Sequence, residues 1–211
     1  TDGITVWNKT HKIMENGINL FGHYSSTQST LIVQKPGSDS LYFIFTTDAP
    51  DAPLPDTPNR GVCYSIVNIN NNKGEGKVIS KNITLLKALS TEKIAGVRHQ
   101  NGKDVWIITP QYFTNKFNAY LLSDVGIDSI PIVSITLNKL ISNDGCLKGS
   151  PNGDLIANAN VLYSSIFKFD NVTGKLSDYL QLPIQSSYGV EFSPDQSKFF
   201  LQIPIDSKHV L

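Results

Sequence analysis

The sequence predicts an all-β fold, and two observations carry that prediction. Strand-like runs rich in β-branched and aromatic residues fill the chain, and clusters of Gly, Asn, Asp, Pro and Ser bound them. A hairpin with one recurring turn chemistry also returns along the chain, at 51 residues from Gly102 to Gly153 and 43 residues from Pro151 to Pro194. Spacings of this size suit four-stranded units repeated around an axis, so the sequence predicts a β-propeller.

The repeated hairpin consists of two apolar strands joined by a tight polar turn. Its copies span residues 29–45, 94–109, 145–159 and 188–203. The four turns are residues 35–39, 100–104, 150–154 and 193–197. Asn-Gly, Pro-Gly and Ser-Pro-Asp at these positions favour tight turns.

A second type of hairpin alternates with the first, and its turn begins with Asn or Asp. Its copies span residues 4–20, 62–85, 118–137 and 165–182. In the last copy, residues 170–174 (DNVTG) are typical of a type I turn closed by a glycine at positive φ. The same residues could suggest a calcium loop, but one carboxylate is too few for that ion, so a plain turn is favoured.

Joining the two hairpin types gives four-stranded blades within a single domain, residues 1–211. Three blades are complete, at about 29–85, 94–137 and 145–182, and two half-blades flank them at 1–20 and 188–203. A proline-rich insert at 48–59 is expected to be a surface loop. The half-blades either pair with each other to close a small ring or belong to a larger propeller, and we favour the larger propeller. A β-sandwich is the alternative fold, but it would not repeat one turn chemistry at near-regular intervals.

Composition excludes several classes of function. Lys plus Arg equal Asp plus Glu at 18 each, and no basic block occurs, which disfavours nucleic-acid binding. No apolar run approaches the roughly 20 residues of a membrane span, so no membrane insertion is expected. Cys63 and Cys146 are expected to be small buried thiols, with a bridge left open. No His or Cys pair has metal-ligand spacing, so we predict no metal and no cofactor.

Several segments resemble a propeller module found in large secreted surface proteins of Bacteroidota, of the gliding-motility-associated type carried by type IX secretion. The matching segments are residues 2–8 (DGITVWN), 25–33, 91–94 (TEKI), 97–106 and 188–195. The resemblance implies a module of a longer exported protein at the outer cell surface, with other domains in the same chain. It supplies no catalytic residues, and the sorting domain of such proteins is absent from these residues.

Candidate ligand-binding residues lie on or just before the first strand of each blade, where a propeller lines its central channel. They are Gln28, Glu92, Lys93, Arg98, His99, Lys148, Tyr188 and Glu191. They either form a pocket for a polar ligand such as a glycan or a peptide end, or pair with one another across the channel. Arg98 and His99 are neighbours in a strand and cannot both face the channel.

No catalytic constellation accompanies these residues. His99 has no Ser, Cys or carboxylate in its own strand to form a relay, and no G-x-S-x-G motif occurs. Strand aromatics such as Trp7 and Trp106 are expected to pack between blades. Tyr112 and Phe113, in the loop 110–117, are the aromatics best placed to meet a ligand.

The sequence therefore predicts a non-enzymatic extracellular binding or scaffold module that presents rim loops to a protein or glycan. A hydrolase or lyase with its site at the channel mouth is the alternative. A purely structural spacer is a third possibility.

Overall fold

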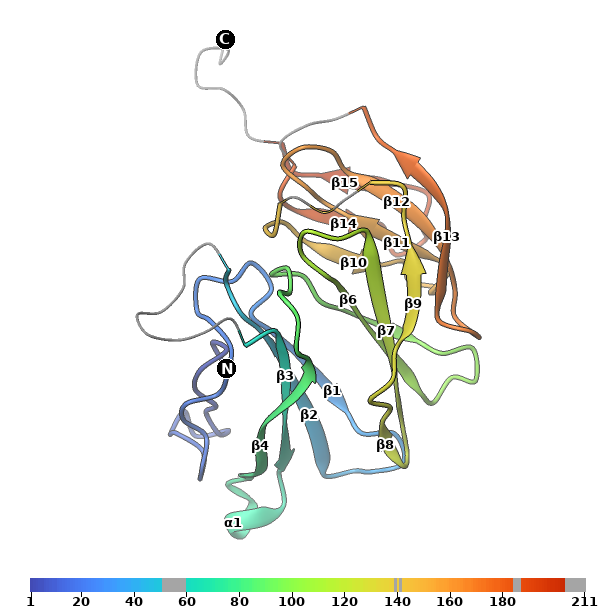
Figure 1. Ribbon diagram of the computed structural model, residues 1–211. Coiled ribbons are helices and arrows are strands. Elements are labelled where there is room, and N and C mark those ends of the chain that lie inside the picture. Colours follow the sequence, from blue (N-terminus) through green and yellow to red (C-terminus); the bar gives the residue numbers. More distant parts are fainter. Residues whose placement is uncertain (51–59, 139, 141, 184–186, 204–211) are drawn as a thin grey trace.

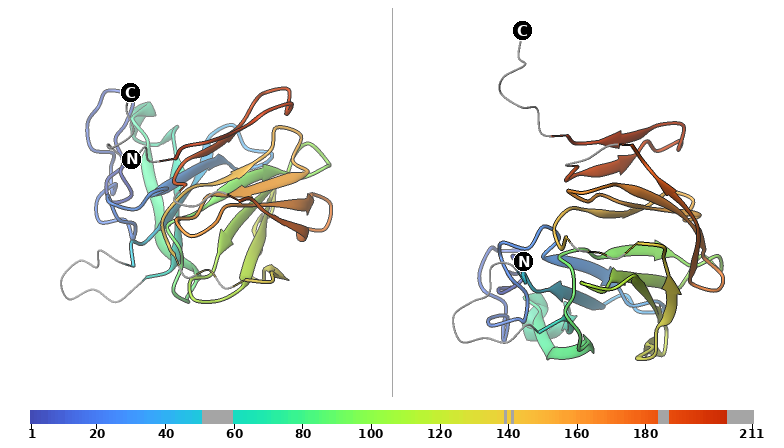
Figure 2. Two further views of the ribbon diagram at one scale, coloured as in Figure 1. Left: turned by 90° about the horizontal axis from the view of Figure 1, so that it is seen from above. Right: turned by 45° about the horizontal axis from the view of Figure 1, so that its top comes forward.

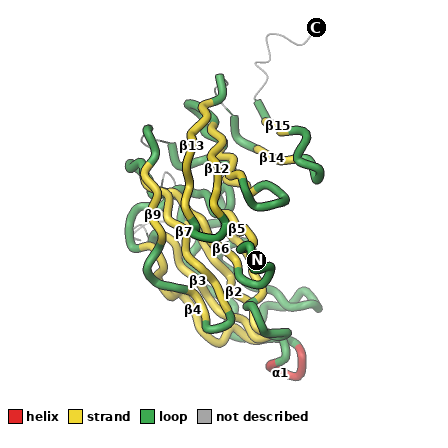
Figure 3. The backbone as a smooth tube through the Cα atoms, turned by 90° about the vertical axis from the view of Figure 1, so that its right-hand side faces the viewer, coloured by secondary structure: helices red, strands yellow, loops and turns green. Residues whose placement is uncertain are grey.

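The protein is an all-β chain of antiparallel sheets with almost no helix. The computed structural model describes residues 1–50, 60–138, 140, 142–183 and 187–203 (Figure 1). Strands dominate the backbone trace, and the single short segment drawn as helix, α1 (Asn71–Gly74), lies at one end of it (Figure 3). Its central residues Asn72 and Lys73 have positive φ, so α1 is a left-handed turn between two strands. Most of the predicted insert, residues 51–59, lies outside the described residues.

Four sheets follow one another along the chain. The first contains β1 (Thr30–Gln34), β2 (Leu41–Thr47), β3 (Val62–Asn68) and β4 (Lys77–Leu86). The second contains β5 (Ala95–Arg98), β6 (Val105–Pro110), β7 (Lys116–Ser123), β8 (Gly126–Ile127) and β9 (Ile132–Ile135), with β8 and β9 both paired to β7. The third contains β10 (Leu147–Gly149), β11 (Leu155–Asn158), β12 (Ser165–Asp170) and β13 (Lys175–Gln181). The fourth contains β14 (Val190–Phe192) and β15 (Phe199–Leu201).

The predicted turns of the first hairpin type recur in the structure with one shared backbone feature. Each of the four turns contains one residue with positive φ, and it is Gly37, Gly102, Gly153 or Gln196. Glycine adopts this conformation without a Cβ clash, so three of the four turns use the residue that the conformation favours. Gln196 adopts it at φ 58° without that advantage. The repeated turn chemistry thus produces a repeated backbone geometry.

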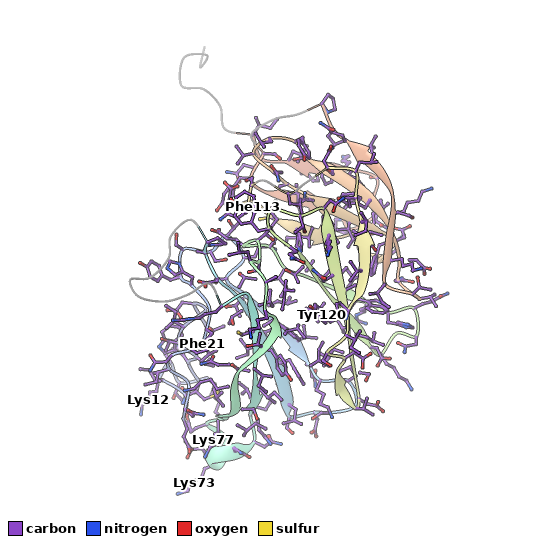
Figure 4. The ribbon with its side chains drawn as sticks, viewed as in Figure 1. Lys12, Phe21, Lys73, Lys77, Phe113 and Tyr120 are labelled. Carbon is purple, nitrogen blue, oxygen red and sulfur yellow. The ribbon has the colours of Figure 1, made fainter. Side chains whose placement is uncertain are left out.

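The sheets stack on one another in chain order, as the right-hand view of Figure 2 shows. Their first strands, β1, β5, β10 and β14, are neighbours in that same order. Apolar clusters fill the spaces between sheets. Phe45, Ile107 and Tyr120 lie between the first and second sheets, and Tyr120 is seen inside the molecule in Figure 4. Phe117 and Phe167 join the second sheet to the third.

The N-terminal segment, predicted as a hairpin over residues 4–20, makes single bridges instead of a strand ladder. Trp7 bridges Ile13, and Glu15 bridges Lys77 of β4. Positive φ values at His11, Asn16 and Asn19 break the extended backbone that a ladder requires. The segment is held by an apolar cluster in which Val6, Met14 and Leu20 pack against the first sheet.

One turn of the third sheet packs against Trp106 of the second sheet. Gly174 closes the 170–174 turn at φ 75°, the glycine geometry that the sequence predicts. The Trp106 indole N–H donates to the carbonyl of Asn171 at 2.9 Å. A Cβ built on Gly174 would lie 2.7 Å from the Trp106 ring. Only a residue without a side chain fits between this turn and the indole.

We expect Gly174→Ala to destabilise the protein more than Gly102→Ala, which is the matched control. Both positions have nearly the same φ, at 75° and 72°, but a Cβ on Gly102 meets nothing within 4 Å. Gly102→Ala should lower the free energy of unfolding by about 1 kcal/mol, because alanine is disfavoured in left-handed backbone. Gly174→Ala should cost about 2–4 kcal/mol, because overpacking against Trp106 is added. Urea unfolding measures both, and equal losses would show that the indole contact carries no energy.

Candidate functional site

The loops that precede β1, β5, β10 and β14 meet at one end of the sheet stack and form a hydrogen-bonded polar node. We use that name for Thr27, Gln28, Glu92, Lys93, Asn143 and Tyr188 together with their direct partners. Each loop supplies at least one of these residues. The node therefore links all four sheets, and it contains Gln28, Glu92, Lys93 and Tyr188 from the predicted candidates.

Glu92 is buried, and its carboxylate is fully engaged by neighbouring loops. Oε2 accepts hydrogen bonds from the Thr27 backbone N–H at 2.8 Å and from the Thr27 hydroxyl at 2.9 Å. Oε1 accepts from the Asn143 side-chain amide at 3.0 Å. The carboxylate thus ties the loop before β5 to the loops before β1 and β10. An acid with both oxygens occupied in this way is a structural acceptor.

Tyr188 joins the node through its phenol group. The Thr27 hydroxyl lies 2.7 Å from Tyr188 Oη. Because that hydroxyl uses its single proton on Glu92, Tyr188 must be the donor. The Tyr188 backbone carbonyl also accepts from the Cys146 N–H at 2.8 Å. The ring stays exposed to solvent while its polar end is held.

Gln28 caps the edges of two sheets with its side-chain amide. Its Oε1 accepts from the backbone N–H groups of Leu147 at 2.7 Å and Ile94 at 3.3 Å. Its Nε2 donates to the Leu147 carbonyl at 3.2 Å. The amide therefore makes with β10 the paired bonds that a neighbouring strand would make.

Lys93 is completely buried and points away from Glu92, toward the third sheet. Its Nζ donates to Asn158 Oδ1 at 3.0 Å and to the carbonyl of Ala159. Burial lowers the pKa of this amine to about 7, although Asp144, Cys146 and Glu92 act in the opposite direction. A charged amine in this place has lost its water, and two hydrogen bonds to neutral acceptors do not replace it fully.

The remaining candidates lie elsewhere. Arg98 is exposed near the far end of β5, while His99 turns toward the third sheet, so the two diverge as strand alternation predicts. His99 Nδ1 accepts from the Asn101 N–H at 3.0 Å, and Nε2 lies 3.2 Å from the Val172 carbonyl. The neutral ring therefore carries its proton on Nε2, and both ring nitrogens are occupied.

Lys148 and Glu191 pair with each other across β10 and β14. Their charged atoms are 3.1 Å apart, and their side chains are 40% and 59% exposed. Pairs this exposed contribute little to stability. Of the charge pairings expected across the channel, this is the one that forms within the described residues.

An open groove of about 960 Å³ lies between the β1–β2 hairpin and the β5–β6 hairpin. Leu31, Val33 and Val105 contribute apolar surface to it. Its charged lining residues are Lys35, Asp39, Arg98 and Lys103. Arg98 is the only predicted candidate in this groove, which lies at the ends of β1 and β5 away from the polar node.

The loop between β6 and β7 presents a pair of aromatic rings. Tyr112 and Phe113 are stacked with their centroids 4.0 Å apart, and Phe113 is 57% exposed. Phe113 lies at the end of β6 and β7 in Figure 4, far from Lys12, Lys73 and Lys77. Its φ of 57° is in the left-handed region, which bulky residues rarely adopt. The backbone is fixed by bonds from the Tyr112 N–H to Leu89 and from the Phe113 N–H to Leu140.

Two kinds of feature in the described residues would indicate a metal site or a membrane span: clusters of metal-ligating side chains and long apolar helices. Within that part of the chain, no group of three or more His, Cys, Asp or Glu side chains is placed to hold a metal ion. No helix of the described ranges is long and apolar enough to cross a membrane. Cys63 and Cys146 are free thiols.

Comparison with known proteins shows the fold alone. No protein-family model matches the chain, and no curated protein matches it. A protein of unknown function from Desulfotomaculum acetoxidans is similar in structure at 16% identity, with a TM-score of 0.50 over 82% of this chain and 48% of that one. A candidate 6-phosphogluconolactonase from Bacteroides fragilis has 13% identity and a TM-score of 0.51 over 94% of this chain and 56% of that one.

A luciferin-regenerating enzyme is also similar, at 15% identity over 86% of this chain and 57% of that one. Its TM-score of 0.39 is too low to support an argument. The chain thus spans about half the length of these structures. The candidate 6-phosphogluconolactonase would be an enzyme, whereas the sequence predicts no enzymatic activity.

Sequence reasoning missed the residues that form hydrogen bonds with the charged groups of Glu92 and Lys93. Thr27, Asn143 and Asn158 make the decisive contacts with Glu92 and Lys93. Each lies 51 or more positions from its partner, and each has the appearance of an ordinary loop or strand-end residue. Only the stacking of the sheets brings them together.

We expect the stability of the wild type, relative to Lys93→Met, to rise with pH from about 7 toward 10.5. The folded pKa of Lys93 is about 7 and its ordinary value is 10.5, so the unfolded state binds more protons between these values. Stability rises with pH wherever the unfolded state binds more protons. Urea unfolding of both proteins across this range measures the difference. Lys12→Met, at an exposed site, is the control and should show a difference that does not change with pH. A flat difference for Lys93→Met would contradict the buried-amine interpretation.

Proposed function

We propose that the sheets are successive blades of a β-propeller and that the chain is a non-catalytic binding module of a larger surface protein. The first and third sheets each have four antiparallel strands, and in the second sheet β8 and β9 share the fourth position beside β7. The first strands of the sheets are neighbours in chain order. Both features support the propeller. The resemblance of residues 2–8 and 91–94 to exported propeller modules supports the surface location.

The observation that carries the binding function is the conformation of Phe113. An apolar ring that is 57% exposed lies on a left-handed backbone, which costs about 1–2 kcal/mol. The exposed ring contributes little burial to offset that cost, and strained exposed residues are typical of ligand sites. The polar node and the packed sheets give the loop a rigid support.

The ligand proposed for this rim is a glycan or a protein surface that stacks on the free face of Phe113. The ring is already stacked on Tyr112, so its orientation is fixed before a ligand arrives. Flat aromatic surfaces of this kind bind the apolar faces of sugars and of side chains. The neighbouring Leu89, which is 44% exposed, extends the apolar surface.

Polar groups that could act in catalysis are engaged within the fold, which supports a non-enzymatic role. Glu92, Lys93 and His99 each have their polar atoms bound by other parts of the chain. A hydrolase or lyase remains the second candidate, because a candidate 6-phosphogluconolactonase has a similar fold. Hydrolysis of 6-phosphogluconolactone is therefore the assay that separates the two functions.

We expect Phe113→Asn to weaken ligand binding while the fold is retained. Asn tolerates left-handed backbone, so the loop keeps its conformation, but the stacking ring is lost at about 1–3 kcal/mol of binding. The measurement is a glycan array followed by titration of any glycan that binds. Val125→Asn is the control, because Val125 is 88% exposed at the opposite end of β7 and should bind as the wild type does.

Circular dichroism establishes that both variants are folded. Unchanged binding by Phe113→Asn would place the ligand elsewhere. Lactone hydrolysis by the wild type, retained in Phe113→Asn, would replace the binding function with the enzymatic one.

A further inference from the structure

The groove between the β1–β2 and β5–β6 hairpins is bordered by two unpaired strand edges. At the two ends of β1, the Ser29 carbonyl accepts from the Thr47 N–H and the Lys35 N–H donates to the Leu41 carbonyl, so the odd-numbered residues face β2. The N–H and C=O groups of Thr30, Ile32 and Gln34 therefore point away from β2. Each edge offers backbone donors and acceptors that no strand of the described chain occupies.

The edge of β5 follows the same rule. His99 donates to Asp104 toward β6, so the odd-numbered residues face β6. Gly96 and Arg98 therefore direct their backbone groups outward, and both are exposed. Gly96 has no side chain, and the place where its Cβ would lie is 3.4 Å from the Leu31 side chain, so the exposed part of this residue is its backbone edge.

The chain itself shows what such an edge binds. At the other end of the same strand array, Ile94 and Leu147 are edge residues of the same kind. The side-chain amide of Gln28 occupies them, with bonds at 3.3 Å to the Ile94 N–H, 2.7 Å to the Leu147 N–H and 3.2 Å to the Leu147 carbonyl. A primary amide has the donor and acceptor of a peptide group, so the Gln28 side chain takes the place of one residue of an added strand.

Charge along the groove favours an anionic partner. Lys35, Arg98 and Lys103 line it, against the single carboxylate of Asp39. Within the described residues, none of the three cations forms a salt bridge. Their positive charge is therefore available to a ligand, and desolvation in a groove strengthens its interaction with a carboxylate.

We propose that this groove binds an acidic peptide segment in extended conformation, added as a strand along the β5 edge. The peptide backbone would pair with Gly96 and Arg98, in continuation of the position that the Gln28 amide occupies. Alternate side chains of a strand share one face, so acidic residues at every second position would meet Arg98 and Lys103. This inference concerns the groove and is independent of the rim site at Phe113.

The backbone edges distinguish a peptide from a simple anion. A carboxylate or phosphate alone would satisfy the cations but would leave the outward N–H and C=O groups of Gly96 and Arg98 to water. A strand satisfies both sets at once, and main-chain bonds supply affinity while side chains supply selectivity. The structure offers both features in one groove.

The test is fluorescence anisotropy with a labelled short peptide of alternating Glu and Val, titrated with the wild-type chain at low salt. Two matched probes accompany it: the same peptide N-methylated at alternate residues, and a peptide of alternating Lys and Val. Arg98→Gln and Lys103→Gln are the groove variants. Lys12→Gln is the control, because it removes one exposed positive charge outside the groove.

The acidic peptide should bind, and Arg98→Gln and Lys103→Gln should each weaken binding about tenfold, as expected for a charge-assisted hydrogen bond. N-methylation should weaken it at least as much, and Lys12→Gln should leave it unchanged. The Lys103 side chain lies in an exposed turn, so its loss should not disturb folding.

Four outcomes would overturn the proposal. Equal binding of the N-methylated peptide would reduce the site to a cationic patch without strand addition. Wild-type affinity in both groove variants would place the peptide elsewhere. Absence of binding by the acidic peptide, or equal binding of the basic one, would remove the charge argument. Loss of glycan binding in Phe113→Asn bears on none of these outcomes, so the proposals for the rim site and for the groove are tested independently.

Discussion

The stack of sheets depends on one set of interactions, the hydrogen bonds that Glu92 and Gln28 make where the first strands begin. Apolar contact between sheets is favourable over many relative positions, because the hydrophobic effect has no direction. The hydrogen bonds that Glu92 accepts from Thr27 and Asn143, and that Gln28 accepts from Leu147, are short and directional. A shift of one sheet along another would leave a carboxylate or an amide unpaired in the interior, which costs several kcal/mol. The node therefore sets the register of the stack.

Local features of this fold could be predicted from the sequence. The turns at 100–104 and 150–154 contain Asn-Gly, and the structure places positive φ at Gly102 and Gly153. A turn is decided by the residues within it, so a short stretch of sequence contains the needed information. The N-terminal hairpin was harder, because isolated left-handed residues such as His11 and Asn16 leave no strong pattern in sequence.

The candidate site could be predicted only in part, for a physical reason. The sequence indicates charged residues at the start of first strands, but whether a charge is available to a ligand depends on neighbours far away in the sequence. Lys93 appears in sequence as an exposed cation and is in fact buried against Asn158 of the third sheet. Arg98, only five residues later, remains exposed in a groove. Strand alternation distinguishes faces, but it does not say which face another sheet will cover.

The treatment of strand edges connects the fold with its proposed binding chemistry. An unpaired edge is a risk, because it can pair with any exposed strand. At one end of β5 the chain removes that risk by supplying the Gln28 amide as a partner. At the other end, Arg98 and the nearby Lys103 repel basic strands and disfavour apolar ones, whose pairing would desolvate the cations. Protection by charge is selective, because the same cations attract a strand that carries carboxylates. The same cations therefore protect the β5 edge against unwanted pairing and select an acidic strand as its partner.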